Sequence, residues 1–249
     1  IPQIIGGLDL ASSKKAEDLF RKIGVKTMIS DDVSIELAKL FTNMYRYINF
    51  AIANEFMVLA DSHDKEIHEI TRLVNFGYTR GGLSSPGLTG CPCLFKDGFF
   101  LISDMPFNDL ISTSWKINES IPLVLMKKVK KEMKLENKNA AILGMAFKAE
   151  IDDVRESLSF KVRKALLREH AKVTLHDPFV KEYVYQEIES DVYKAVENAD
   201  LIFVGTNHKQ YQRLDIKKIK AAVNKNCLVC DIWNVFGTGK ILFRISELD

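Results

Sequence analysis

The segment from Val33 to Ser62 constrains this chain most, because it contains neither proline nor glycine. Its apolar residues recur at the spacing of a helix, and they are Leu37, Leu40, Phe41, Met44, Ile48, Ala51, Ile52 and Phe56. The polar run Ser30-Asp31-Asp32 precedes it, as is usual before a helix. At a rise of 1.5 Å per residue, about 30 residues would form a helix roughly 45 Å long. A helix of that length often crosses between domains or forms a dimer interface.

Shorter patterns fill the rest of the first half. Predicted strands cover Pro2–Gly6 and Val25–Ile29, and predicted helices cover the stretch up to about Lys22, Lys65–Phe76, Phe107–Ser114 and Ser120–Lys134. A glycine-rich loop runs from Gly77 to Gly90. The first half of the chain is therefore predicted to be mostly helical.

The pattern changes character at Asn139. Predicted strands at Ala140–Leu143, Lys172–His176, Leu201–Gly205 and Leu228–Ile232 alternate with predicted helices at Ser159–Glu169, Val192–Asn198 and Ile216–Val223. This alternation indicates right-handed βαβ units and a parallel sheet covered on both faces. The predicted fold class is α/β: a helical central domain with a long helix, followed by a Rossmann-like, doubly wound parallel sheet that begins near residue 137.

Composition excludes several classes of function. The chain has 249 residues, 47% of them hydrophobic, and 35 Lys and Arg against 33 Asp and Glu, for a net charge of +2. This balance gives no support for nucleic acid or an anionic membrane as a partner. No apolar run approaches the ~20 residues that a membrane helix needs. Four cysteines make no disulfide framework in a chain of this size, so a cytoplasmic location is expected.

The first turn of the predicted sheet departs from the usual dinucleotide-binding pattern. That pattern is G-x-G-x-x-G, whereas the turn here runs from Gly144 to Lys148 with one glycine. Asp177, at the end of the second strand, keeps the acidic position of such folds. The turn could still bind a nucleotide, with Lys148 facing phosphate and Phe147 providing apolar contact.

The four cysteines form two pairs, Cys91 with Cys93 and Cys227 with Cys230. A four-thiolate zinc site is one interpretation, but C-P-C is not the usual spacing, and strand alternation would point the second pair to opposite faces. Buried free thiols are the alternative for that pair, and no metal is expected. Cys93 differs, because it follows the glycine-rich loop and lies near Lys96. That setting is typical of a reactive nucleophile.

Lys39 and Asn43 are spaced four residues apart in the long helix, so they share one helical face. A solvated lysine is the simpler interpretation. Directed at a thiol, the pair would instead place a positive charge and an amide donor where an oxyanion develops.

Three stretches of this chain resemble the UDP-glucose/GDP-mannose dehydrogenase family of nucleotide-sugar 6-dehydrogenases. Residues Glu36–Glu55 are similar to the family's central helix, with its Lys-x-x-x-Asn pair and closing Asn-Glu. Residues Pro86–Asp97 resemble its glycine-rich loop that ends in Cys-x-x-Lys-Asp. Residues Leu143–Ser157 resemble the Gly-x-x-Phe-Lys and Asp-Asp-x-Arg-Glu-Ser signature of its nucleotide-sugar domain.

The resemblance implies a four-electron oxidation of the C6 alcohol of a UDP-sugar to a uronic acid, with NAD as cofactor. An aldehyde forms first, and a cysteine then carries a thiohemiacetal and a thioester that water hydrolyses. By position Cys93 would be the nucleophile, Lys39 and Asn43 would stabilise oxyanions, and Asp97 would assist water or tune Lys39. Further substrate-binding residues would be Phe147, Lys148, Arg80, Gly90 and Arg155. A homodimer is also expected.

The same resemblance divides the chain into three parts. Residues 1–32 would be the tail of an NAD-binding domain, 33–136 a central helical and dimerisation domain with the cysteine loop, and 137–249 a UDP-binding domain. The start at Ile1 would then be a cut edge. Two departures concern the substrate: Cys91-Pro92 replaces the family's common residues, and Trp233 lies near the place of a substrate-contacting arginine.

Two other functions fit the sequence. The chain could be a nucleotide-sugar-binding or dimerisation fragment without activity of its own. It could also resemble the β-hydroxyacid dehydrogenases, which share the Lys-x-x-x-Asn helix but need no cysteine.

Overall fold

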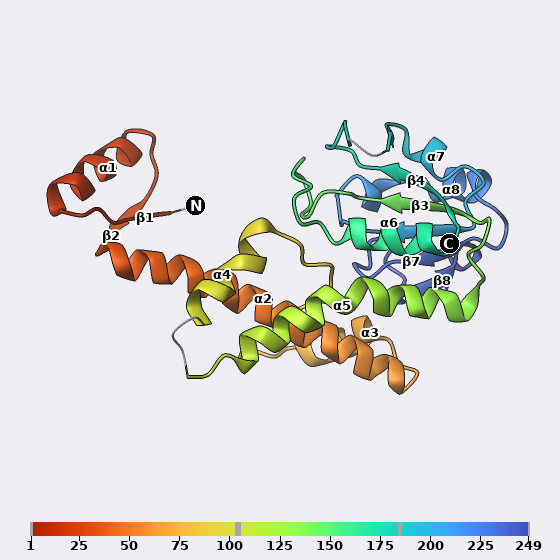
Figure 1. Cartoon of the computed structure of the whole chain (residues 1–249), viewed down its shortest axis with the longest axis horizontal. Helices are drawn as coiled ribbons and strands as arrows, with labels where there is room; N and C mark the ends of the chain where they lie inside the picture. Colours follow the sequence, from red (N-terminus) through yellow and green to blue (C-terminus); the bar gives the residue numbers. More distant parts are fainter. Residues whose placement is uncertain (1, 103–105, 184–185, 249) are drawn as a thin grey trace.

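A computed structural model describes residues 2–102, 106–183 and 186–248. Its helices and sheet are arranged along one long axis, with a small lobe at one end and a layered α/β region at the other (Figure 1). Two long helices connect these ends. No helix within the described ranges is long and apolar enough to cross a membrane.

The small lobe contains the first two strands and one helix. Strands β1 (Gln3–Ile5) and β2 (Thr27–Ile29) pair in parallel, and α1 (Leu10–Lys22) connects them. Asp9 begins α1, since its carboxylate accepts the N–H of Ser12 at 2.6 Å. The three predicted elements are confirmed, and the lobe lies at the N-terminal end of α2, away from the larger sheet (Figure 1).

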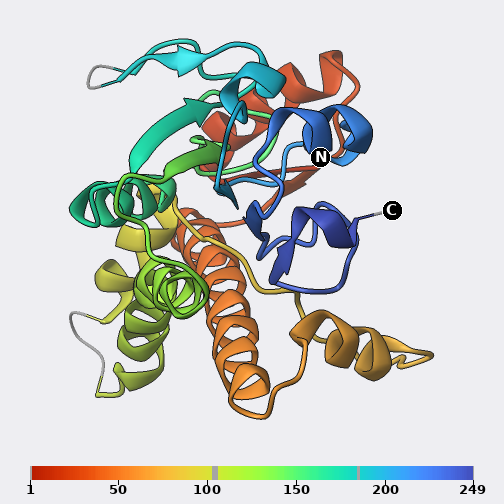
Figure 2. The same cartoon turned by 90° about the vertical axis from the view of Figure 1, so that its right-hand side faces the viewer.

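The long predicted helix is confirmed as α2 (Asp32–Ser62). The Asp31 carboxylate accepts the N–H of Ser34 at 2.8 Å and so caps its first turn. One face of α2 is buried against α5, which lies beside it (Figure 2). The opposite face leaves large apolar side chains exposed, namely Phe41, Tyr45, Ile52, Phe56 and Leu59.

Three further helices complete the helical half: α3 (Ile67–Asn75), α4 (Pro92–Ile102) and α5 (Asp109–Glu132). The sequence did not predict α4. It also predicted two helices where α5 is one, with Pro122 inside it. A proline inside a helix costs about 3 kcal/mol because it removes a backbone hydrogen bond, whereas the burial of the Pro122 ring is favourable.

The larger sheet has six strands in the order β5-β4-β3-β6-β7-β8. Their bounds are β3 (Asn139–Leu143), β4 (Lys172–His176), β5 (Ile188–Glu189), β6 (Leu201–Val204), β7 (Leu228–Cys230) and β8 (Leu242–Arg244). All pairs are parallel except β7 with β8. The predicted fold class is therefore confirmed, with an added antiparallel edge strand. Gly237 and Gly239, both with positive φ, let the chain reverse before β8.

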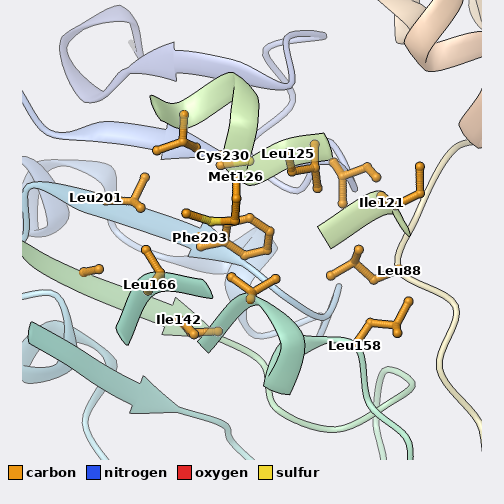
Figure 3. Close-up of a cluster of buried hydrophobic side chains, with 14 of the residues drawn as sticks. Leu88, Ile121, Leu125, Met126, Ile142, Leu158, Leu166, Leu201, Phe203 and Cys230 are labelled. Carbon is orange, nitrogen blue, oxygen red and sulfur yellow. The ribbon is translucent and has the colours of Figure 1, made fainter. Parts of the chain in front are cut away.

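Helices cover both faces of this sheet: α6 (Ser159–Arg168), α7 (Val192–Ala195) and α8 (Ile216–Ala222). Short 3₁₀ turns lie at Tyr211–Arg213 and Ile245–Glu247. One buried cluster joins Leu125 of α5 and Leu166 of α6 to Ile142 and Phe203 of the sheet (Figure 3). Because α5 packs into this core, the helical half and the sheet are held together by shared burial.

Candidate active site

A cavity of about 500 Å³ opens between α2, the glycine-rich loop and the turn after β3. Helix α2 contributes Lys39, Asn43, Arg46 and Phe50, which are four, three and four residues apart and so form one helical face. The remaining lining residues are Leu88, Thr89, Gly90, Cys91, Cys93, Leu94, Phe147, Lys148, Ala149, Ile151, Asn207 and Trp233. The cavity therefore has one wall from the helical half and one from the sheet.

Cys93 lies in the first turn of α4 and not in a loop. The residue is exposed as a whole, and its backbone N–H is 3.4 Å from the Cys91 sulfur, which caps the turn. Burial, Cys91 and Asp97 raise the pKa of the Cys93 thiol, whereas Lys39 lowers it. The resting group is therefore a thiol, and attack on a carbonyl requires its proton to leave.

Asn43 connects α2 to the helix that carries this thiol. Its side-chain N–H donates to the Asp97 carboxylate at 2.6 Å, and Asn43 is buried. Asp97 lies four residues after Cys93, on the same face of α4. The structure thus brings Lys39, Asn43, Cys93 and Asp97 together around one end of the cavity.

Phe147 and Lys148 line the other wall, in the turn after β3. Gly144 begins this turn with φ of 98°, and a β-carbon there would lie 2.5 Å from the Thr206 side chain. Only glycine meets both conditions. Lys148 is exposed and Phe147 half-buried, so both are accessible to a ligand.

Asp177 is part of this turn's interior and does not face a ligand. Its buried carboxylate accepts the N–H groups of Met145 at 2.7 Å and Ala146 at 2.9 Å. The Nδ1 of His208 accepts a hydrogen bond from the N–H of Glu150, so Nε2 carries the proton and donates to Asp177 at 3.2 Å. Burial alone would raise the pKa of Asp177, but hydrogen bonds from His208 and the backbone lower it to about 2.

Among the other predicted substrate residues, Gly90 lines the cavity, while Arg80 and Arg155 are absent from the lining that the structure describes. Arg155 pairs with Asp153 at 2.6 Å, and its pKa is raised by Asp153 and, less strongly, by the two nearby thiols. Arg155 is therefore near enough to Cys93 and Cys91 to interact with them electrostatically, although it does not line the cavity. Arg80 is exposed in the glycine-rich loop.

The sequence interpretation missed Arg46 and Phe50 as site residues. They continue the face of Lys39 and Asn43, so extending that spacing by two turns would have found them. Trp233 also lines the cavity, and its ring lies 6.4 Å from the Phe50 ring in an edge-to-face contact. Its indole N–H donates to the Gly205 carbonyl at 3.0 Å.

The remaining cysteines are not part of the cavity. Cys227 and Cys230 belong to the apolar clusters on opposite faces of the sheet, as strand alternation predicted. Burial raises the pKa of the Cys227 thiol to about 12 and also raises that of Cys230. Within residues 2–102, 106–183 and 186–248, no three His, Cys, Asp or Glu side chains are arranged to hold a metal ion.

Comparison with known proteins gives two family matches. Residues 33–120 match the central domain of the UDP-glucose/GDP-mannose dehydrogenase family, and residues 141–238 match its UDP binding domain. The UDP-N-acetyl-D-mannosamine dehydrogenase of Methanocaldococcus jannaschii is 32% identical over 94% of this chain and 55% of its own length.

Solved structures agree with these matches. The UDP-N-acetylmannosamine dehydrogenase of Pyrococcus horikoshii has a TM-score of 0.74 at 28% identity, covering 89% of this chain and 53% of that one. The corresponding enzyme of Staphylococcus aureus has a TM-score of 0.76 at 26% identity, covering 90% and 52%. The chain thus spans about half the length of the relatives that it matches.

Proposed function

Because this chain belongs to the UDP-glucose/GDP-mannose dehydrogenase family, we propose that the full-length protein oxidises the C6 alcohol of a UDP-sugar to the acid in two steps. Four electrons leave the sugar, and NAD is the proposed acceptor. The carrying observation is one cavity that joins Lys39, Asn43 and Cys93 to Phe147 and Lys148. A single elongated substrate would fit this cavity, with its reacting carbon beside Cys93 and its nucleotide beside Phe147 and Lys148.

The residues at the thiol end suit acyl chemistry. The Cys93 sulfur adds to the C6 aldehyde, giving a thiohemiacetal whose oxyanion is stabilised by the Lys39 ammonium. Asn43 uses one amide N–H for Asp97 and keeps the second for the same oxygen. Oxidation of the thiohemiacetal gives a thioester, and water releases the acid and the free thiol. Asp97 orients Asn43 and accepts a proton from that water.

The proposed NAD site lies outside the turn after β3. The turn after β3, where a dinucleotide lies in a Rossmann fold, uses the N–H groups of Met145 and Ala146 for Asp177. The UDP part of the substrate is therefore assigned to Phe147 and Lys148, with Arg46 as a further cation along the cavity. We keep the division into three parts: residues 1–32 as the tail of an NAD-binding domain, 33–136 as the central domain and 137–249 as the UDP-binding domain. NAD would be bound by the full-length protein, mainly through the domain to which residues 1–32 belong.

The proposed substrate is a UDP-N-acetylhexosamine in preference to UDP-glucose. Support comes from the relatives described above, whose names specify N-acetylmannosamine. We also propose a homodimer formed through the exposed apolar face of α2, and a location in the reducing cytoplasm, in keeping with four free cysteines.

A panel of UDP-sugars assayed for NADH with the full-length protein tests this function. The expected result is two NADH per sugar with an N-acetylated substrate, and loss of the acid product in Cys93→Ser. Normal turnover by Cys93→Ser would exclude the cysteine mechanism and favour a β-hydroxyacid-dehydrogenase-like reaction. A matched Cys227→Ser variant, altered at a buried thiol outside the cavity, should keep wild-type activity.

The second candidate, for the chain taken by itself, is binding of a nucleotide sugar without activity. Both walls of the cavity come from this chain, which favours this candidate. UDP at ten times its dissociation constant should stabilise the chain by about 1.4 kcal/mol. The absence of any UDP-dependent rise in Tm would remove the nucleotide assignment.

A further inference from the structure

The segment that leads to Cys93 has no regular secondary structure, yet it is buried. Residues 86–90 are shielded from solvent, although they belong to neither a helix nor a strand. Asn54 of α2 replaces the missing backbone partners at the centre of this segment. Its side-chain oxygen accepts the Gly87 N–H at 3.0 Å, and its side-chain N–H donates to the Gly87 carbonyl at 3.1 Å. The Asn54 amide thus pairs with Gly87 as a neighbouring strand would.

A second buried amide fixes the orientation of Asn54. The Asn54 side-chain nitrogen donates to the Asn118 side-chain oxygen at 2.9 Å, and the Asn118 nitrogen donates to the Tyr47 carbonyl at 3.0 Å. Neither Asn54 nor Asn118 is exposed to solvent. If the Asn54 amide were flipped, its nitrogen would face the Gly87 N–H, and its oxygen would face the Gly87 carbonyl and the Asn118 oxygen. Each buried group left without a hydrogen bond would cost about 1–3 kcal/mol.

The sheet region closes on the same glycine from the other side. A β-carbon at Gly87 would lie 2.3 Å from the Trp233 ring, so the indole rests directly on this backbone. A β-carbon added at Gly90 would likewise lie 2.3 Å from the Glu156 carbonyl oxygen. We call Asn54, Asn118 and Trp233 the Gly87 clamp. It holds the chain six residues before Cys93 between α2 and the nucleotide-side wall of the cavity.

We propose that Asn54 is a positioning residue for the Cys93 thiol and acts through Gly87. It touches neither the cavity nor the reacting atoms, and its effect passes along the short segment from Gly87 to the first turn of α4. Trp233 belongs both to the cavity wall and to the clamp. A nucleotide sugar that contacts Trp233 would therefore act, through the indole ring, on the Gly87 backbone. This inference rests on the proposed function for its kinetic part only.

The first experiment needs no turnover. Full-length wild type, Asn54→Ala and Asn49→Ala are compared by hydrogen–deuterium exchange. Asn49 is the matched control, since it lies on α2 and, among the residues that the structure describes, its side chain donates to the Tyr45 carbonyl of its own helix. Asn54→Ala should speed exchange in residues 83–94 and leave strand β3 at the wild-type rate. Exchange unchanged in residues 83–94 would overturn the proposal.

The second experiment separates positioning from general stability. A misplacement of the nucleophile by about 1 Å can cost roughly 100-fold in rate, so kcat of Asn54→Ala should fall by about that factor. KM for the UDP-sugar should remain at the wild-type value, and Asn49→Ala should match wild type in both. A wild-type kcat in folded Asn54→Ala, or an equal loss in Asn49→Ala, would overturn the proposal.

Asn118→Ala keeps the proposal testable if Asn54→Ala does not fold. This variant leaves the pairing of Asn54 with Gly87 in place but removes the acceptor that orients the Asn54 amide. Exchange in residues 83–94 should therefore rise, and kcat should fall, by less than in Asn54→Ala. Wild-type exchange and kcat in this variant would count against the clamp. Failure of the proposed function shows in the wild type as absent turnover, whereas failure of this inference shows only as variants that behave like wild type.

Discussion

The side-chain amide of Asn43 donates to the Asp97 carboxylate at 2.6 Å, across 54 positions of sequence. This contact joins the long helix α2 to the helix that carries Cys93. It places an acidic group one turn from the thiol, while Lys39 on α2 opposes its charge. Burial and Cys91 have the larger effects on the pKa of the Cys93 thiol, and these two side chains from two helices add opposite contributions to it.

Replacing these two charges should move the Cys93 pKa in opposite directions. Asp97 raises the thiol pKa, so Asp97→Asn should lower it; Lys39 lowers the thiol pKa, so Lys39→Met should raise it. The measurement is the pH profile of Cys93 alkylation by iodoacetamide, followed by mass spectrometry of its peptide. Glu36→Gln, which removes an exposed charge of α2 outside the cavity lining, serves as control. Shifts of the same sign in the two variants would contradict this electrostatic arrangement.

Asp177 should stabilise the folded protein above acidic pH. Its folded pKa of about 2 lies below the ordinary 3.8, so the contribution is complete above about pH 4 and is lost as pH falls through 2. The difference corresponds to about 2 kcal/mol. Asp177→Asn should therefore lower the free energy of unfolding in urea at pH 7 by at least this amount, and by less near pH 2.

Asp18→Asn is the control for that measurement, because Asp18 is exposed on α1. Its effect should stay within about 0.5 kcal/mol. Equal stability of Asp177→Asn and wild type at pH 7 would mean that the buried carboxylate is not holding the turn.

Gly90→Ala should displace the loop that precedes Cys93. The new β-carbon would lie 2.3 Å from the Glu156 carbonyl oxygen and 2.9 Å from the Ser157 α-carbon, and backbone on both sides cannot move away cheaply. We expect a loss of about 1–3 kcal/mol of stability together with reduced turnover of the full-length protein. Gly82→Ala, in the same loop, meets the exposed Asn75 amide, which pairs with the Leu83 backbone, so it should disturb only this exposed part of the loop and leave turnover unchanged.

The exposed apolar face of α2 should carry the proposed dimer. Phe41→Glu combined with Tyr45→Glu places two charges on side chains that are 58% and 73% exposed in one subunit. Burying unpaired charges is costly, so sedimentation should show a monomer. Leu167→Glu on α6, also a large exposed apolar residue, should leave the dimer intact. A wild-type protein that sediments as a monomer would refute the dimer directly.

Much of the fold could be predicted because its signals are local. The caps and periodicity of α2 indicate its bounds to within one residue, and the strands of the sheet are recognisable as short apolar runs between helices. Helix α4 was missed because Gly98 interrupts its pattern. That glycine serves a tertiary contact, since a β-carbon there would lie 2.8 Å from the Met44 sulfur and from Ile111. Such a requirement arises only from the packing of three helices and leaves no local signal.

The site divides in the same way. The spacing of Lys39 and Asn43, and the position of Cys93 after a glycine-rich loop, are local signals, but it was the family resemblance that joined them in one expected site. The place of Asp177 could not be predicted from its position alone. Its partners Met145 and Ala146 lie 32 and 31 residues earlier, and only the parallel pairing of β3 with β4 brings them together.

The buried Asp177 gives the turn after β3 an anion of its own. Where a bound phosphate completes such a turn, the order of the loop depends on the ligand. Here the negative charge is covalently part of the chain, so the order of the wall carrying Phe147 and Lys148 does not depend on a bound phosphate. The proposed nucleotide sugar would then meet a preorganised surface, so little of its binding free energy would be spent on ordering this turn.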